Sequence, residues 1–354
     1  MNLKKLGWND YFLALANGYI DDEDFTVARV SKEHKGLYEI LNEDGQLFAE
    51  ISGKMQHNSS ERNDYPAVGD WVVIKKQQHE NRAIIHNVLP RRSKFSRKVA
   101  GATTQEQIVA ANIDTIFLVS ALNSDLNIRR IERYLVMAWE SGANPVIILT
   151  KSDLCYDVES KVLDVEHIAI GVPIHVVSAM NGSGITDILP YLKEGETIAL
   201  LGSSGVGKST LTNKLLGKEL LKVQNIREAD DKGRHTTTHR ELVVLPTGGV
   251  LIDTPGMREL QLWSAEDSVD VSFEDITRFA ELCKFRDCNH EHEPGCAVKQ
   301  AIKNDELDQE RLTSYHKLQK ELEYLERKTD KLAQLKEREK WKKLAGDRTR
   351  VHRR

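Results

Sequence analysis

The sequence has few cysteines and prolines, and it lacks any long hydrophobic run. It holds four cysteines and eight prolines in 354 residues. No apolar run approaches the ~20 residues that a helix needs to cross a bilayer, so no membrane span is predicted. A signal peptide is not indicated either, because the first apolar stretch is broken by Asn9 and Asp10 and lacks a small-residue cleavage site. We therefore expect a cytoplasmic protein.

Charge is unevenly distributed along the chain. The formal net charge is −4, yet residues 327–354 hold twelve Lys and Arg against four Asp and Glu. A second basic cluster, Pro90–Lys98, carries five Lys and Arg around Phe95. Basic clusters are commonly solvated faces or mobile tails, so each alone is weak evidence for a polyanionic partner. Two of them on an acidic chain favour contact with nucleic acid.

Three segments differ in pattern, and we predict three domains. Residues 24–88 contain five short, partly alternating runs separated by turn sequences, which is typical of a small barrel of the oligonucleotide-binding (OB) type. An SH3-like module or another small β-barrel fits the same periodicity. The predicted domains are 1–98 for this barrel with a basic linker, 99–263 for an α/β domain, and 264–354 for a polar, helical, zinc-binding domain.

The middle segment alternates apolar runs with helical patterns. "DTIFLVSAL", "PVIILT", "IHVVSAM" and "TIALL" are continuous enough to be parallel strands covered on both faces. "IRRIERYLVMAWESG" predicts an amphipathic helix ended by a glycine, and "KSTLTNKLLG" predicts another. This alternation predicts a doubly wound α/β domain.

A phosphate-binding loop follows the fourth apolar run. "GSSGVGKS" fits G-x-x-x-x-G-K-[ST] and opens a helix, which is the context that the motif requires. Its glycines let backbone N–H groups point at phosphates, while Lys208 would bridge the β- and γ-phosphates and Ser209 would bind Mg²⁺. An ordinary glycine-rich turn is the alternative. The predicted ligands are Gly202, Ser203, Ser204, Gly205, Val206, Gly207, Lys208, Ser209 and Thr210.

Two loops earlier in the chain have the residues that recognise guanine. "TKSD" follows a buried strand, and the Asp153 carboxylate can accept both N1–H and N2–H₂ of guanine, bonds that adenine cannot make. Alone, this tetrapeptide would be interpreted as a surface turn. A second buried strand leads into "SAM", whose backbone can meet guanine O6. The predicted base-binding residues are Thr150, Lys151, Ser152, Asp153, Ser178 and Ala179.

Two further motifs follow the phosphate loop. "DTPG", about 45 residues later, places Asp253 where a carboxylate holds Mg²⁺ through water and Gly256 where an amide senses the γ-phosphate. "GRHTTT" matches the switch whose hydroxyl reaches Mg²⁺; we predict Thr237, with Thr236 as its neighbouring candidate. The base loops thus precede the phosphate loop, the reverse of the usual order. A circular permutation preserves such a site, because ligand loops lie beyond the carboxyl ends of parallel strands in any chain order.

A cysteine cluster opens the C-terminal segment. "CKFRDCNHEHEPGC" supplies three thiolates and an imidazole, the ligand set of a closed, structural Zn²⁺ site. The predicted ligands are Cys283, Cys288, His290 and Cys296, with His292 as the competing histidine. Unpaired buried cysteines are the alternative interpretation.

Together these motifs resemble the RsgA (YjeQ/YloQ) family of bacterial GTPases. The resemblance spans essentially the whole chain and rests on "GSSGVGKST", "GRHTTT" and "DTPG" in permuted order. It implies binding to the 30S ribosomal subunit and 16S rRNA, GTP hydrolysis stimulated by that subunit, and release from the matured particle. We expect no membrane or DNA partner and take a monomer as the default. Thr150 departs from the Asn of most G domains, and its shorter side chain is expected to lose a tethering contact.

The residues around "DTPG" predict slow intrinsic hydrolysis. Met257 occupies the place of the glutamine that orients the attacking water in Ras-like enzymes. His235, which the resemblance also indicates, is our candidate for positioning that water, and a surface histidine without a role is the alternative. The predicted catalytic residues are therefore His235 and Thr237. The predicted cofactors are GTP or GDP, Mg²⁺ and one structural Zn²⁺.

Two other functions fit parts of the sequence. One is an RNA-binding assembly module that uses GTP as an unhydrolysed structural or switch ligand; the intact Lys208, Ser209 and Asp253 weaken it. The other is a P-loop kinase or ATPase, against which the two guanine loops argue. A ribosome-dependent GTPase that assists maturation of the small subunit is the favoured prediction.

Overall fold

The computed structural model describes most of the chain. The described residues are 2–20, 24–34, 36–59, 61–77, 80–98, 106–123, 125–217, 241–253 and 266–324. The chain divides into two compact units. The first comprises Met1–Lys98 with Gln105–Gln261, and the second comprises Val99–Thr104 with Leu262–Arg354.

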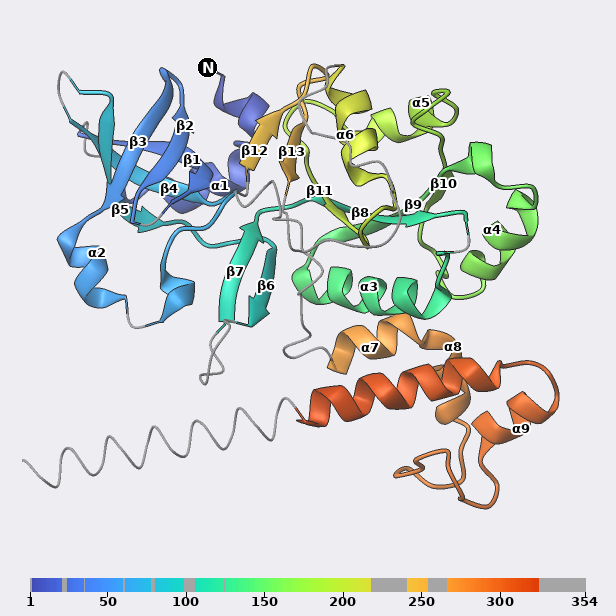
Figure 1. Cartoon of the computed structure of the whole chain (residues 1–354). Helices are drawn as coiled ribbons and strands as arrows, with labels where there is room; N and C mark the ends of the chain where they lie inside the picture. The colour runs from blue at the N-terminus through green and yellow to red at the C-terminus, as the bar shows by residue number, and fades with distance from the viewer. Residues whose placement is uncertain are drawn as a thin grey trace, which may run out of the picture. The chain divides into compact units, whose positions relative to one another are not determined.

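Five strands near the N-terminus close into a barrel (Figure 1). They are β1 (Phe25–Glu33), β2 (Tyr38–Asn42), β3 (Gly45–Ile51), β4 (Trp71–Lys76) and β5 (Arg82–Val88), with helix α2 (Gly53–Asn58) after β3. β1 pairs with β2 on one side and β4 on the other, and parallel pairing of β3 with β5 completes the circuit. Alternate side chains of β2 and β3 face inward, as their period-two pattern requires. The predicted OB-type barrel is confirmed.

The α/β region is built on strands in the order β10-β9-β8-β11-β13-β12. Their bounds are β8 (Thr115–Ala121), β9 (Asn144–Thr150), β10 (Ile174–Val176), β11 (Thr197–Leu201), β12 (Glu241–Val244) and β13 (Val250–Asp253). All neighbours pair in parallel except β12, which is antiparallel to β13. Every residue of β8 and β11 is buried, as expected for strands that are covered on both faces. β11, which leads into the phosphate loop, lies between β8 and β13.

Helices cover both faces of this part of the sheet. α3 (Ile128–Ser141) packs on β8 and β9 and ends at Gly142, as predicted. Leucines of α6 (Lys208–Leu216) join a core cluster with Phe117 and Val119 of β8. Figure 1 shows α3 and α6 on opposite sides of the strands. The connections on either side of β10 contain α4 (Val158–Glu166) and α5 (Ile185–Ile188). The doubly wound arrangement is therefore confirmed.

The barrel and the α/β region share one continuous sheet. β1 pairs with β12, where Lys32 lies opposite Glu241 and their side chains form a 2.7 Å ion pair. Arg29, also in β1, is buried and donates hydrogen bonds to four groups from separate stretches of the chain. These acceptors are the carbonyl oxygens of Leu6, Gly69 and Asn112 and the hydroxyl of Thr197. Burial lowers the pKa of the Arg29 guanidinium to about 10.

Two features of the first unit are not predicted by the sequence patterns. A 3-10 turn, η1 (Leu3–Leu6), and helix α1 (Asp10–Ala16) pack into a core cluster with Trp71. Strands β6 (Lys94–Lys98) and β7 (Glu106–Ala111) form a separate two-stranded sheet. β6 falls inside the basic cluster, whose Lys and Arg residues interrupt any apolar run around the buried Phe95.

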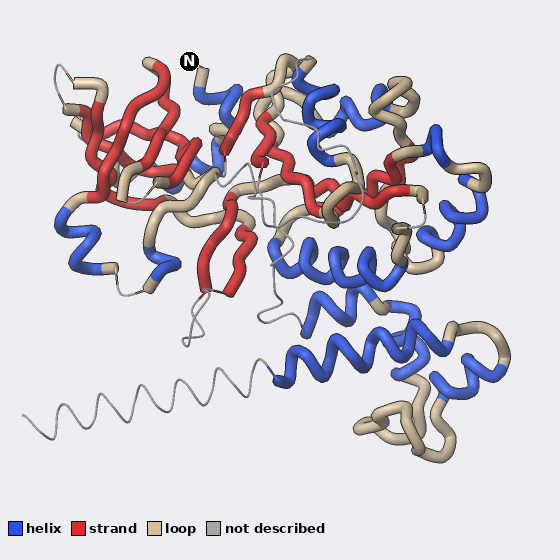
Figure 2. Tube along the Cα trace, viewed as in Figure 1, coloured by secondary structure: helices blue, strands red, loops and turns tan. Residues whose placement is uncertain are grey.

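The described part of the second unit, residues 266–324, contains helices and loops but no strand (Figure 2). Its helices are α7 (Glu266–Ser272), α8 (Glu274–Ala280), α9 (Ala297–Lys303) and a further helix over 309–324. Arg311 from the last helix binds the Asp275 carboxylate, and its guanidinium lies 4.6 Å from the centre of the Phe273 ring. Within the described ranges, no helix combines the length and hydropathy needed to cross a bilayer.

Candidate nucleotide site and metal cluster

The phosphate loop joins the carboxyl end of β11 to the start of α6. At Gly202, an added Cβ would lie 2.3 Å from the carbonyl oxygen of Val119, so only glycine fits between the two strands. Gly207 caps α6 with a φ of 99°, a conformation that glycine adopts without strain. Lys208 Nζ donates to the carbonyl oxygens of Gly202 and Ser203 at 2.7 Å each, so the lysine bends back over the loop. Phosphates bound here would also meet the positive end of the α6 dipole.

The two predicted base loops meet each other. "TKSD" follows β9, with Lys151 in the left-handed region at a φ of 59° and Asp153 exposed in the next turn. The second loop follows β10, and its buried Ser178 donates from Oγ to Asp153 Oδ1 at 2.5 Å. This bond orients the carboxylate, which keeps lone pairs for further donors because each carboxylate oxygen accepts two bonds. Ala179 follows directly and is half-buried.

Thr150 links the base loop to the phosphate loop. Thr150 is buried, and its hydroxyl oxygen lies 2.5 Å from the carbonyl oxygen of Val206 and 3.2 Å from that of Ser120. A hydroxyl has one proton to donate, and the shorter contact, to Val206, is the stronger hydrogen bond. The expectation that threonine loses the tethering contact is therefore wrong. It fails because the loop carbonyl lies within reach of the shorter side chain.

These loops lie at one edge of the sheet. The base loops follow β9 and β10, the phosphate loop follows β11, and Asp253 is the last residue of β13. Parallel α/β sheets bind ligands beyond this carboxyl edge, at the point where the strand order reverses. Ser209 and Thr210 occupy the first turn of α6, while Ser204 and Gly205 are exposed. The remaining predicted residues lie outside the described residues: His235, Thr236, Thr237 and Gly256.

The structure adds two residues that the motif search misses. Asp125 follows β8, and Arg130 lies in the first turn of α3. The Arg130 guanidinium donates to Ser203 Oγ at 2.9 Å and lies 3.2 Å from Asp125 Oδ2. Neither residue belongs to a motif. The only signal in the sequence is that both follow β8, the strand that pairs with β11.

The predicted metal ligands come together in the second unit. The ligand atoms of Cys283, Cys288, His290 and Cys296 all lie within 4.8 Å of one another. A tetrahedral zinc site with bonds of roughly 2.3 Å to sulfur and 2.0 Å to nitrogen has edges of roughly 3.8 Å and 3.5 Å. Here the Cys283 and Cys296 sulfurs are 3.9 Å apart, and His290 Nδ1 lies 3.7 Å and 3.4 Å from them. The cluster therefore has the dimensions of a zinc site.

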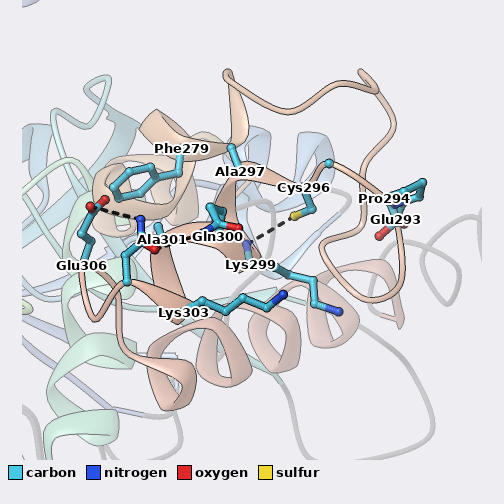
Figure 3. Close-up of a pocket in the computed structure, with 12 residues that line it drawn as sticks. Phe279, Glu293, Pro294, Cys296, Ala297, Lys299, Gln300, Ala301, Lys303 and Glu306 are labelled. Atoms are coloured by element: carbon cyan, nitrogen blue, oxygen red, sulfur yellow. Dashed lines mark hydrogen bonds between the residues drawn. The ribbon is translucent and has the colours of Figure 1, made fainter.

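Backbone N–H groups donate hydrogen bonds to two of the cysteine sulfurs in this cluster. Cys296 caps α9 and accepts the amide N–H of Lys299, as Figure 3 shows. Burial alone would raise the pKa of the Cys283 thiol, but N–H groups of Val298 and Ala297 outweigh it and lower the pKa. A hollow of about 560 Å³ beside Cys296 is lined by residues of α9 and the loop before it (Figure 3).

The competing histidine is placed elsewhere. His292 is exposed and does not belong to the group of four ligand atoms, and its backbone N–H donates to the Glu293 carboxylate.

The basic cluster Pro90–Lys98 is partly occupied by internal ion pairs. Arg91 binds both carboxylate oxygens of the buried Asp70. Arg92 and Lys94 each pair with a carboxylate at 3.3 Å and 3.0 Å. Three of its five basic residues thus bind the protein itself, which weakens the argument that this cluster contacts a polyanion. The other basic segment, 327–354, lies outside the described residues.

The fold and loops define a circularly permuted P-loop GTPase with an N-terminal OB-type barrel and a C-terminal Cys₃His cluster. A model of the RsgA GTPase family matches residues 88–263. "Small ribosomal subunit biogenesis GTPase RsgA 1" of Oceanobacillus iheyensis is 49% identical over 320 residues, 90% of this chain and 91% of that relative. The RsgA of Opitutus terrae is 44% identical and covers 99% of this chain, with 98% of its own length matched. The chain belongs to the RsgA GTPase family and is a GTP-hydrolysing enzyme.

Solved structures agree with this assignment. YjeQ from Thermotoga maritima superposes with a TM-score of 0.64 at 29% identity, covering 84% of this chain and 98% of that one. YloQ, described as a circularly permuted GTPase, superposes with a TM-score of 0.61 at 24% identity, over 84% of this chain and 95% of its own length, and supports the fold alone. An ABC transporter model also matches, over residues 185–351. That range contains the phosphate loop, a motif that many nucleotide-binding families share.

Proposed function

We propose that this protein binds the 30S ribosomal subunit through 16S rRNA, assists its late maturation, and hydrolyses GTP to leave the matured particle. The names of its relatives, small ribosomal subunit biogenesis GTPases, support the choice of partner. The observation that carries the nucleotide part of the proposal is the Thr150–Val206 hydrogen bond, because it joins the predicted guanine loop to the phosphate loop. The protein acts as a monomer in the cytoplasm.

GTP or GDP is held by residues from both loops. Asp153 accepts the guanine N–H groups, the loop 202–207 donates backbone N–H groups to the phosphates, and Lys208 swings from its loop carbonyls to the β- and γ-phosphates. Ser209, Asp253 (through water) and Thr237, with Thr236 as the neighbouring candidate, would hold Mg²⁺. When bound, that ion neutralises charge on the β- and γ-phosphates. The Gly256 amide senses the γ-phosphate.

Hydrolysis depends on a group that orders the attacking water. Met257 cannot do so, and His235 takes this role in the complex with the 30S subunit. We expect His235→Ala to retain GTP binding but to lose most of the hydrolysis that 30S subunits stimulate. Turnover of GTP and ATP with and without 30S subunits measures this. Unchanged stimulated turnover in His235→Ala would reject the role.

The cysteine cluster holds one structural Zn²⁺ through Cys283, Cys288, His290 and Cys296. Four protein ligands leave no position open for water, so the ion stabilises structure rather than reacting. The division into domains 1–98, 99–263 and 264–354 stays a prediction. RNA contact is assigned mainly to the basic segment 327–354, since much of the other basic cluster is internally paired.

Sedimentation with 30S subunits tests the proposed function directly. We expect the protein to pellet with 30S subunits in a non-hydrolysable GTP analogue and to remain largely in the supernatant with GDP. The matching ATP analogue is the control. With it, the fraction of protein that pellets with 30S subunits should equal the fraction that pellets without nucleotide. Equal pelleting in all conditions would contradict a GTP-controlled association.

A further inference from the structure

A closed ring of side chains holds the first turn of the phosphate loop. Arg130 Nη1 donates to Ser203 Oγ at 2.9 Å, and Ser203 Oγ donates to Asp125 Oδ2 at 3.1 Å. The same guanidinium nitrogen lies 3.3 Å and 3.2 Å from the two Asp125 oxygens. Each of the three side chains therefore contacts both others. The ring connects a turn after β8 and the start of α3 to a loop more than 70 residues later in the chain.

Nothing in the phosphate-loop motif requires this ring. Ser203 occupies an unrestricted position of G-x-x-x-x-G-K-[ST], where the backbone rather than the side chain serves the phosphates. Asp125 and Arg130 belong to none of the guanine, switch or Mg²⁺ motifs. Their side chains are 44% and 32% exposed, so the pair is reachable by solvent and is not a core element.

The loop needs such support because its sequence is flexible. It has glycines at 202, 205 and 207, and glycine loses more conformational entropy on ordering than any other residue. If the loop becomes ordered only when the ligand binds, the lost conformational entropy reduces the affinity. A loop that is already ordered in the free protein does not carry this cost. Thr150 holds the far side of the loop at Val206. The Asp125–Arg130 ring holds its near side, at Ser203.

We propose that Asp125 and Arg130 are positioning residues that pre-order the phosphate loop for nucleotide binding. The ring contacts the first turn of the loop and acts through Ser203, so it supports the site for GDP and GTP alike. Its loss raises the dissociation constants of both nucleotides by the same factor and leaves kcat unchanged. This inference rests on the proposed nucleotide site.

The test compares two adjacent arginines of α3. Arg129 and Arg130 have equally exposed side chains, 32% each, and each forms an ion pair with a carboxylate. Arg129 pairs with Glu132 of its own helix at 2.8 Å, whereas Arg130 reaches the phosphate loop. Arg130→Ala should raise the dissociation constants of fluorescent GDP and GTP analogues about three- to tenfold. Arg129→Ala takes this partner from the buried Glu132 carboxylate and should lower stability, but it should leave both constants within twofold of the wild type.

Two further variants separate positioning from general destabilisation. Ser203→Ala removes only a hydroxyl and should weaken GDP binding less than Arg130→Ala. The variant that combines Ser203→Ala with Arg130→Ala should bind GDP no more weakly than Arg130→Ala alone, because both substitutions open the same ring. Arg130→Lys keeps the charge and one donor and should recover part of the affinity.

The outcomes distinguish this inference from the proposed function. A wild-type protein that does not bind GDP would overturn the nucleotide site itself. A wild type that binds GDP, with Arg130→Ala matching Arg129→Ala, would overturn only the ring. A fall in kcat at unchanged affinity would also overturn it, because Arg130 would then act on the transition state.

Discussion

The nucleotide site draws its side chains from loops far apart in the chain, whereas all four predicted metal ligands lie between residues 283 and 296. The nucleotide loops are held by buried strands and by contacts such as Thr150–Val206, which spans 56 residues. The metal loop has no comparable support, since only His290 and Cys296 are buried within 284–296. The described loops of the proposed nucleotide site are therefore joined by the protein itself. We expect the proposed metal site to depend on its ion.

Removing the metal should give the largest effect. We expect Cys296→Ala, or a strong chelator, to remove one zinc ion per chain and to unfold the loop 283–296, because zinc supplies on the order of 10 kcal/mol to small domains of this kind. Zinc content by elemental analysis and limited proteolysis of this loop measure the change.

The matched control is Cys155→Ala, which removes a cysteine outside the cluster. That variant should retain its zinc. GDP affinity should stay within twofold in all these proteins, and a large loss of GDP affinity on chelation would contradict the contrast between the two sites.

The connection between the barrel and the α/β region is also built from segments far apart in the sequence, because Arg29 donates hydrogen bonds to groups from several of them. Arg29→Met leaves the carbonyl oxygens of Leu6, Gly69 and Asn112 without this donor, and should lower the free energy of unfolding by about 3 kcal/mol. The surface pair Lys32–Glu241 is a suitable control, and Lys32→Met should cost less than about 1 kcal/mol. Denaturant titrations measure both. Equal losses would show that Arg29 is no more than a surface contact.

The Thr150 tether should give a smaller effect, confined to the nucleotide. Thr150→Ala leaves the buried Val206 carbonyl without its hydroxyl donor and should weaken GDP binding about tenfold, or about 1.4 kcal/mol. Thr150→Ser keeps the hydroxyl and should remain within about twofold of wild type. Competition with a fluorescent GDP analogue measures both variants. If serine and alanine behave alike, the hydroxyl is not what joins the loops.

Strands, helices and motifs were predictable from the sequence where a single local pattern of residues is sufficient to specify them. The buried strand and the Gly-Lys-Ser pattern before α6 predict the phosphate loop, and the five alternating runs predict the barrel. Contacts between loops were not predictable, because they depend on which strands become neighbours. Arg130 reaches Ser203 only because β8 and β11 pair. The outcome for Thr150 depends on the position of a single carbonyl oxygen, which no motif encodes.

One substitution tests most directly whether the permuted loops close around a single guanine nucleotide. Asp153→Asn replaces an acceptor of the guanine N2–H₂ by an amide that can donate to the C2 carbonyl of xanthine. We predict a loss of GDP affinity by a factor on the order of 100 or more, with xanthosine diphosphate bound in preference. Asp157→Asn, which keeps the cap of α4, should bind GDP as the wild type does. Adding Lys208→Ala to Asp153→Asn should abolish binding of both nucleotides, whereas undiminished GDP binding by Asp153→Asn would contradict the account.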